Sequence, residues 1–164
     1  LHLSIRRQRQ MCIRDREPQK GKTQLEYNRR YYQEILDVVK AYKDYSILGH
    51  LDVIKRYDLN GEIELEKIKD LIEQIFEVVI ADGKGIELNT SSRAYHLKSL
   101  MPSREILELY HDMGGKIITI GSDAHNADRV GDRVMESQKI LKEIGFNGIY
   151  TFDQMKPKFH EFKF

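Results

Sequence analysis

The stretch Lys116-Ile117-Ile118-Thr119-Ile120-Gly121-Ser122-Asp123-Ala124-His125 decides the fold and the chemistry that we expect of this chain. Its apolar first half predicts a buried strand that ends at the Gly-Ser pair. In extended backbone, residues i and i+2 point to the same side. Asp123 and His125 are therefore expected to converge at the end of the strand, where α/β folds carry their functional groups. This pair predicts a metal site.

Helical and strand-like patterns alternate along the chain from about residue 23 to the C-terminus. The expected helices are 25–42, 64–81, 104–113 and 130–144, and the expected strands are 45–50, 86–90, 116–120 and 148–152. Successive strands lie roughly 30 to 40 residues apart, which is typical of parallel βα units. Four strands do not close a barrel, which usually needs about eight. We therefore expect an α/β fold that is an incomplete part of a barrel, as a single domain over residues 23–164.

The composition is that of an ordinary globular domain, with 164 residues, 40% hydrophobic and 32% charged. No apolar run approaches the roughly 20 residues of a membrane span, so we expect no membrane partner. A single cysteine, Cys12, cannot form an internal disulfide, and this favours a reducing, cytoplasmic setting.

The net charge of +1 hides an uneven distribution, because residues 1–22 hold seven basic and two acidic side chains. Residues 23–164 are consequently acidic and lack the basic footprint of a nucleic-acid binder. The basic tract has neither a helical apolar face nor strand alternation. It resembles a translated sequencing-adapter read, and we expect that residues 1–22 are either foreign to the natural protein or disordered.

Polar side chains follow each of the first three expected strands. His50 comes after the first, with Arg56 shortly beyond it, and Arg93 follows the second, which also holds Glu87 and Asn89. Asp123 and His125 follow the third. In a parallel sheet these ends share one edge. Imidazole and carboxylate ligands suit zinc, iron or manganese better than calcium, and arginine forks match a phosphate group.

Each residue also has a structural interpretation when it is taken alone. His50 is then a packed or surface histidine, and Asp123 is the N-cap of the following helix. Arg56 and Arg93 are surface partners of nearby carboxylates; the candidates are Asp52, Asp58 and Glu87. The functional interpretation gains weight because the same side of three successive units carries these residues.

Three motifs together resemble a known family. They are Gly49-His50-Leu51-Asp52-Val53-Ile54-Lys55-Arg56-Tyr57, Glu87-Leu88-Asn89-Thr90-Ser91 and Gly121-Ser122-Asp123-Ala124-His125. They are similar, in this order, to motifs of the histidinol-phosphatase branch of the polymerase and histidinol phosphatase (PHP) superfamily. The resemblance implies a distorted (β/α)7 TIM-like barrel and a cluster of up to about three divalent metals, Mn, Zn or Fe.

The resemblance also implies a role for each motif residue. His50, Asp123 and His125 correspond to metal ligands, and Arg56 and Arg93 to the arginines that hold the substrate phosphate. The implied reaction is hydrolysis of a small-molecule phosphate ester, L-histidinol phosphate, in histidine biosynthesis. In that reaction, Asp123 or His125 would assist proton transfer to the leaving group.

The chain departs from the family pattern at its beginning. No His-x-His pair occurs anywhere in the sequence, and nothing between Thr23 and His50 matches the family's second motif. We therefore expect a C-terminal part of the PHP phosphatase domain that lacks several metal ligands. Two alternatives stay open: a catalytically dead fragment or metal- or phosphate-binding module, and another PHP-type phosphoesterase.

Overall fold

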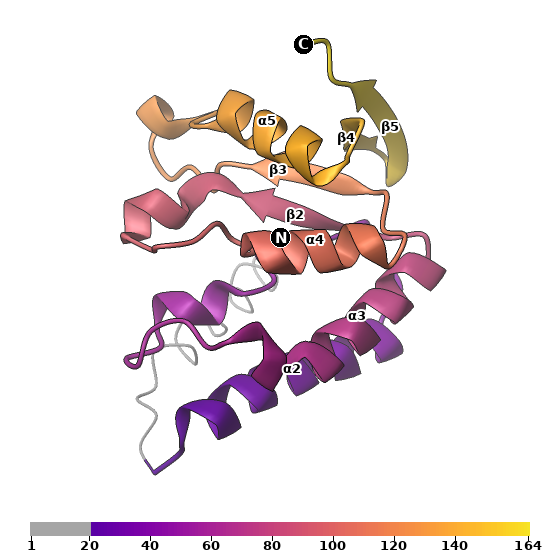
Figure 1. Cartoon of the computed structure of the whole chain (residues 1–164). Helices are drawn as coiled ribbons and strands as arrows, with labels where there is room; N and C mark the ends of the chain where they lie inside the picture. Colours follow the sequence, from indigo (N-terminus) through magenta and orange to yellow (C-terminus); the bar gives the residue numbers. More distant parts are fainter. Residues whose placement is uncertain (1–20) are drawn as a thin grey trace, which may run out of the picture.

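The fold was analysed in a computed structural model, in which residues 21–164 are described. Helices and strands alternate over most of this range (Figure 1). The α-helices are α2 (Gln24–Ala41), α3 (Lys69–Ala81), α4 (Arg104–Asp112) and α5 (Val134–Ile144). The strands are β1 (Ile47–Leu48), β2 (Gly85–Asn89), β3 (Ile118–Gly121), β4 (Gly148–Asp153) and β5 (Lys156–Glu161). Short 3-10 helices are η1 (Val53–Arg56), η2 (Leu65–Lys67), η3 (Thr90–Tyr95) and η4 (Ala127–Arg129).

A three-stranded parallel sheet with β2 in the middle confirms the predicted α/β class. Leu48 of β1 lies opposite Ile86 of β2, and Ile86 in turn lies opposite Ile118 of β3. These aliphatic side chains share one face of the sheet, where they pack with α2, α3 and α4 into the hydrophobic core. Glu87 alternates with Ile86 and Leu88 and therefore lies on the opposite face.

The helix ends follow from local sequence signals. Thr23 caps α2 in a reciprocal capping box with Glu26. Ser103 caps α4, as predicted, by accepting a hydrogen bond from the amide of Ile106. The helix predicted from residue 64 instead begins with the 3-10 turn η2, and α3 starts at Lys69.

The C-terminal region differs from the prediction of a fourth parallel strand. β4 lies next to β3 but joins a separate two-stranded sheet, in which it pairs antiparallel with β5. The last strand expected from the sequence ended at residue 152, and no strand was assigned to the tail after it. Its polar and aromatic residues nevertheless extend along β4 because a two-residue turn at Gln154 and Met155, both with positive φ, reverses the chain.

The prediction for residues 1–22 lies almost entirely outside the described residues, and its boundary stays a prediction. None of the helices between residues 21 and 164 combines the length and the apolar character that crossing a membrane requires.

Candidate functional site

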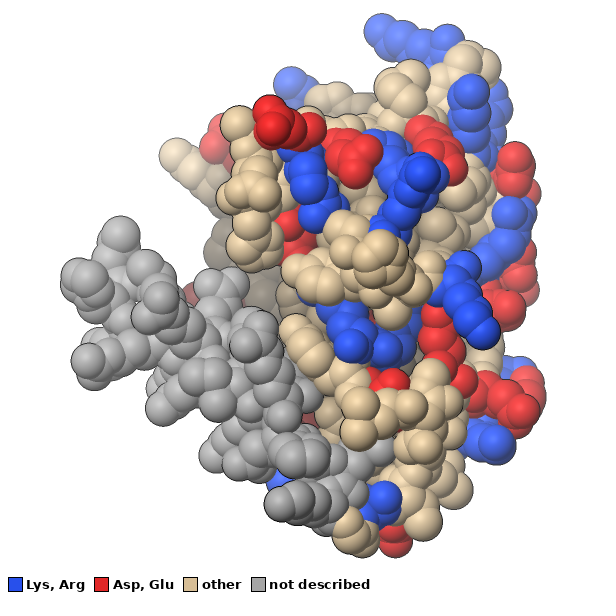
Figure 2. All heavy atoms as spheres, turned by 90° about the vertical axis from the view of Figure 1, so that its left-hand side faces the viewer, with Lys and Arg blue, Asp and Glu red and all other residues tan. Residues whose placement is uncertain are grey.

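The carboxyl ends of β1, β2 and β3 meet at one edge because these strands are parallel. His50 lies just beyond β1, Asn89 ends β2 and Gly121 ends β3. Figure 2 shows the left-hand side of Figure 1, where β2 and β3 end, and Lys and Arg lie there interspersed with Asp and Glu. The predicted convergence of the three strand ends is confirmed.

Arg56 carries a nearly buried guanidinium at this edge. Its side chain is 6% exposed, and Nη2 lies 3.3 Å from Oδ2 of Asp123. Nη2 also donates to Oγ of Ser91, and the guanidinium carbon lies 3.8 Å from the ring centroid of Tyr95. Nε is buried and has no hydrogen-bond partner among the described residues. The carboxylate partner is Asp123 and none of the three acids considered from the sequence.

Asp123 and His125 follow β3 in a turn rather than in extended backbone. Asp123 has a φ of 47°, in the left-handed region that non-glycine residues rarely adopt. The expected i, i+2 alternation therefore does not apply to this pair. Instead, Nδ1 of His125 lies 2.9 Å from the Asp123 carbonyl oxygen. If Nδ1 holds the proton, Nε2 presents its lone pair, as in many metal-binding histidines.

Asp123 does not cap a helix, because η4 begins at Ala127 with Asn126 at its N-cap, and α5 begins at Val134 with Arg133 at its N-cap. The interpretation of Asp123 as a helix N-cap is therefore wrong. Non-glycine residues with strained backbone often occur at functional sites. His50 shares this property, with a φ of 29°, so two of the candidate metal ligands have left-handed backbone.

Asp52 and Lys55 anchor the segment that carries His50 and Arg56. Their side chains are 4% and 6% exposed, and Nζ of Lys55 lies 2.8 Å from Oδ2 of Asp52. Ser103 donates its backbone N–H to the same oxygen, whereas Oδ1 has no hydrogen-bond partner among the described residues. Burial raises the pKa of the Asp52 carboxyl, and the nearby Lys55 ammonium opposes that rise.

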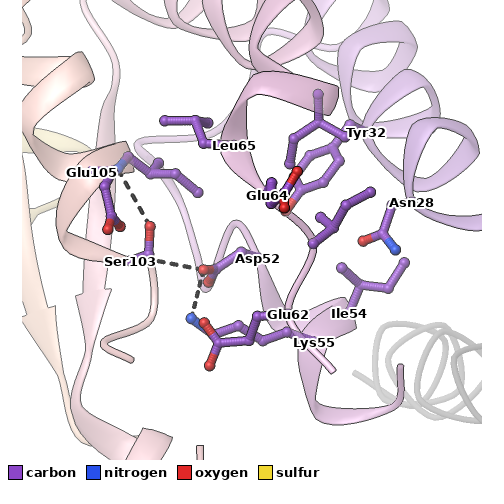
Figure 3. A pocket seen from close by; sticks show the side chains of 13 residues that line it. Asn28, Tyr32, Asp52, Ile54, Lys55, Glu62, Glu64, Leu65, Ser103 and Glu105 are labelled. Atoms are coloured by element: carbon purple, nitrogen blue, oxygen red, sulfur yellow. Dashed lines mark hydrogen bonds and ion pairs between the residues drawn. The ribbon is translucent and has the colours of Figure 1, made fainter. Parts of the chain in front are cut away.

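A cavity of about 320 Å³ adjoins the Asp52–Lys55 pair. Figure 3 shows the Asp52 carboxylate between Lys55 and Ser103, with Tyr32 and Ile54 among the other lining side chains. Because Asp52 precedes η1 and accepts the backbone N–H of Ser103, which precedes α4, this carboxylate links η1 to the start of α4. Sequence reasoning gave Lys55 no role, although its spacing of three residues from Asp52 is compatible with a contact across one 3-10 turn.

Glu87 reaches from the middle strand to the loop after β1. Its Oε2 accepts the backbone N–H of His50 at 3.0 Å and the side-chain amide of Asn89 at 3.2 Å. Sequence reasoning noted Glu87 and Asn89 near a strand end but gave them no site role. Alternation along β2 was the signal that could have placed both on the face opposite the core.

Arg93 is exposed in η3 and does not share the contacts that join Arg56 to Asp123. It lines a second cavity, of about 350 Å³, together with Lys98, Arg104 and Arg133, and neither Arg56 nor Asp123 lines that cavity. Within residues 21–164, Arg93 forms no ion pair, so the surface pairs considered from the sequence are absent.

The three candidate ligands have suitable chemistry for a divalent metal, but they do not form a complete site. His50 and His125 are exposed, and Asp123 is partly buried. Between residues 21 and 164, no three side chains of His, Cys, Asp or Glu lie close enough together to hold a metal ion. Any metal bound at this edge therefore needs further ligands.

Comparison with known sequences defines the class of protein. Residues 4–91 match the family described as the PHP domain, and the chain belongs to that family.

Two curated relatives are 35% and 30% identical to the chain. The first is a probable histidinol-phosphatase of Thermotoga maritima, aligned over 74% of the chain and 50% of the relative. The second is a histidinol-phosphatase of Lactococcus lactis, aligned over 80% and 49%. The predicted resemblance to histidinol-phosphatases is confirmed, and the chain spans about half the length of these relatives.

Two solved structures support the same fold. The histidinol phosphate phosphatase of Lactococcus lactis, crystallised with zinc, L-histidinol and phosphate, superposes with a TM-score of 0.72 at 28% identity. That match covers 84% of the chain and 53% of the solved one. A histidinol phosphatase homologue from Listeria monocytogenes gives a TM-score of 0.59 at 16% identity, over 68% and 44% of the two chains.

Proposed function

We propose that this chain forms part of a metal-dependent histidinol-phosphatase, which hydrolyses L-histidinol phosphate to L-histidinol and phosphate. The observation that carries the proposal is the nearly buried Arg56 guanidinium at the edge where the parallel strands end. The relatives named above support the substrate. On this proposal the parallel sheet is a segment of a distorted (β/α)7 barrel, and the enzyme works in the cytoplasm.

Arg56 and Arg93 are the proposed phosphate-binding residues. Arg56 is held by Ser91, Asp123 and the face of Tyr95, which orients its planar fork before a ligand arrives. Its unpartnered Nε shows that the surrounding residues do not satisfy all of its donors. Arg93 is exposed in η3 and has no competing ion pair within residues 21–164, so its guanidinium is free to bind a phosphate.

His50, Asp123 and His125 are the proposed metal ligands of this chain, with Mn, Zn or Fe as the candidate ions. A bound divalent metal would lower the pKa of a coordinated water to about 7 and supply hydroxide near neutral pH. These three residues contribute to the site, and the remaining ligands are proposed to lie outside residues 21–164. Asp123 or His125 is further proposed to assist the proton transfer to the leaving alkoxide.

Calorimetric titration of the 164-residue chain with inorganic phosphate tests the arginine roles. We expect Arg93→Ala to weaken phosphate binding about tenfold or more, because charge-assisted hydrogen bonds are lost. Arg30→Ala is the matched control, since Arg30 is an exposed helix residue paired with Glu34. Equal phosphate affinity of the Arg93→Ala variant and the unaltered chain would contradict the proposal.

Turnover separates an active enzyme from a binding module. Because no three ligands cluster among the described residues, we expect the 164-residue chain to release little phosphate from L-histidinol phosphate, even with added Zn²⁺ or Mn²⁺. Rapid turnover would show that the incomplete metal site inferred for this chain is wrong.

A further inference from the structure

Three side chains of the middle strand and its end form a continuous set of hydrogen bonds. Glu87, Asn89 and Ser91 follow one another at every second position, and we call them the Glu87–Asn89–Ser91 ladder. Oε2 of Glu87 accepts from Nδ2 of Asn89 at 3.2 Å. Oδ1 of Asn89 accepts from both the backbone N–H and the hydroxyl of Ser91.

Each end of the ladder contacts a candidate site residue on another segment. At one end, Glu87 accepts the backbone N–H of His50 at 3.0 Å. At the other end, the Ser91 hydroxyl accepts from Nη2 of Arg56. His50 precedes η1 and Arg56 is the last residue of η1, so the ladder contacts both ends of residues 50–56, which lie within the first motif.

The hydrogen bond to His50 restrains an unusual backbone conformation. A non-glycine φ of 29° is unfavourable and persists only where surrounding contacts enforce it. A carboxylate that accepts a backbone N–H makes a stronger hydrogen bond than a neutral acceptor. Glu87 forms no ion pair with a cation among residues 21–164, so its charge is directed to this amide and to Asn89.

Two glycines at the ends of the neighbouring strands leave room for the Glu87 carboxylate: Gly49 directly follows β1, and Gly121 is the last residue of β3. A Cβ on Gly121 would overlap with Oε1 of Glu87, whereas a Cβ on Gly49 would lie 3.5 Å from Oε2, an ordinary contact. The chain therefore offers a substitution that should displace Glu87 and a neighbouring one that should not.

We infer that Glu87 is a positioning residue, which fixes the His50 backbone directly and the Arg56 guanidinium through Asn89 and Ser91. The inference rests on the proposed function only in that His50 and Arg56 are taken as site residues. It assigns the ladder the task of setting the distance and orientation between a metal ligand and a phosphate-binding arginine.

Nuclear magnetic resonance of the 164-residue chain tests this inference without a metal or substrate. In Glu87→Ala, the His50 amide should exchange with solvent about tenfold faster or more, since its acceptor is lost. The Arg56 Nε–H resonance should also shift. Core amides such as that of Ile72 should exchange at an unchanged rate, which separates a local effect from global destabilisation.

Two further variants make the test specific. Gly121→Ala should reproduce the changes at His50 and Arg56 by displacing Glu87, and Gly49→Ala should not. Glu87→Gln keeps one acceptor oxygen and should restore part of the protection of the His50 amide. An unchanged His50 amide or Arg56 signal in Glu87→Ala would overturn the inference, as would equal changes in the two glycine variants.

The phosphate titration is separate from these signals. If the unaltered chain failed to bind phosphate while the His50 and Arg56 signals responded as expected, the proposed function would fail and the positioning role of Glu87 would stand.

Discussion

Replacing Lys55 by methionine should destabilise the chain strongly, because it leaves the Asp52 carboxylate buried without its cation. Nζ of Lys55 lies 2.8 Å from Oδ2 of Asp52 and 2.8 Å from Oγ of Ser99, and it also donates to the Leu100 carbonyl. After the substitution, the carboxylate of Asp52 would keep the hydrogen bond from the Ser103 backbone N–H but would have lost its ion pair with Lys55. Methionine matches the length of the lysine stem, so the lost interaction is mainly electrostatic.

The expected loss is about 3–5 kcal/mol, the usual cost of removing one partner of a buried ion pair. Exposure of 6% and 4% for the two side chains places this pair in that class. A loss of this size is a large share of the roughly 5–15 kcal/mol by which domains are usually stable. The double variant Lys55→Met/Asp52→Asn should be more stable than Lys55→Met alone by about 1–3 kcal/mol, since no charge is left unpaired.

Urea unfolding followed by circular dichroism measures these differences as free energies of unfolding. Lys43→Met is the control, because the Lys43–Asp82 pair is 48% and 28% exposed, and partly exposed pairs contribute about 0.2–1 kcal/mol. If Lys55→Met cost no more than Lys43→Met, the reasoning about burial would be refuted. The same holds if the double variant were no more stable than Lys55→Met.

Two further predictions concern stability. Gly85→Ala should lower the free energy of unfolding by about 1–3 kcal/mol, since the added Cβ would overlap with the Ile117 carbonyl across the sheet. If urea unfolding showed Gly85→Ala to be as stable as Gly49→Ala, this prediction would be contradicted. Hydrogen bonds from Arg29 lower the pKa of Asp70, so the pair stabilises the fold above the ordinary carboxyl pKa and loses that contribution as pH falls. The stability difference between the unaltered chain and Asp70→Asn, at most about 1 kcal/mol because both partners are exposed, should shrink from about pH 5 to about pH 2. If the stability difference between the unaltered chain and Asp70→Asn did not change with pH, the stabilising role of the Arg29–Asp70 pair would be contradicted.

Local signals predicted the four α-helices, although the two expected from residues 64 and 130 begin at Lys69 and Val134. Ser103 is a small polar residue before an apolar-periodic segment, and it caps α4 as expected. The boundaries of the strands were less predictable: residues 45–50 were expected to form the first strand, whereas β1 has only two residues. A strand ends where its neighbour stops pairing, and that neighbour lies elsewhere in the sequence.

The candidate site was predictable in composition but not in contacts. His50, Arg56 and Asp123 were singled out because they follow strands, and the structure places them at one edge of the sheet. The sequence offered three possible partners for Arg56, and the actual one was not among them. Glu87 was visible as a polar residue in a strand, yet its contact with the His50 amide depends on the register between β1 and β2.

The sequence by itself determined the parallel α/β class, the Ser103 cap and the family motifs. The class depends on how far apart successive strands lie along the chain, and the cap and the motifs depend on patterns within short segments. Only the tertiary structure decided that Arg56 meets Asp123, that Glu87 holds His50, and that β4 pairs with β5 rather than with β3. The first two contacts join residues 67 and 37 positions apart. Such contacts depend on strand register and on turns with left-handed backbone, and no local pattern fixes either one.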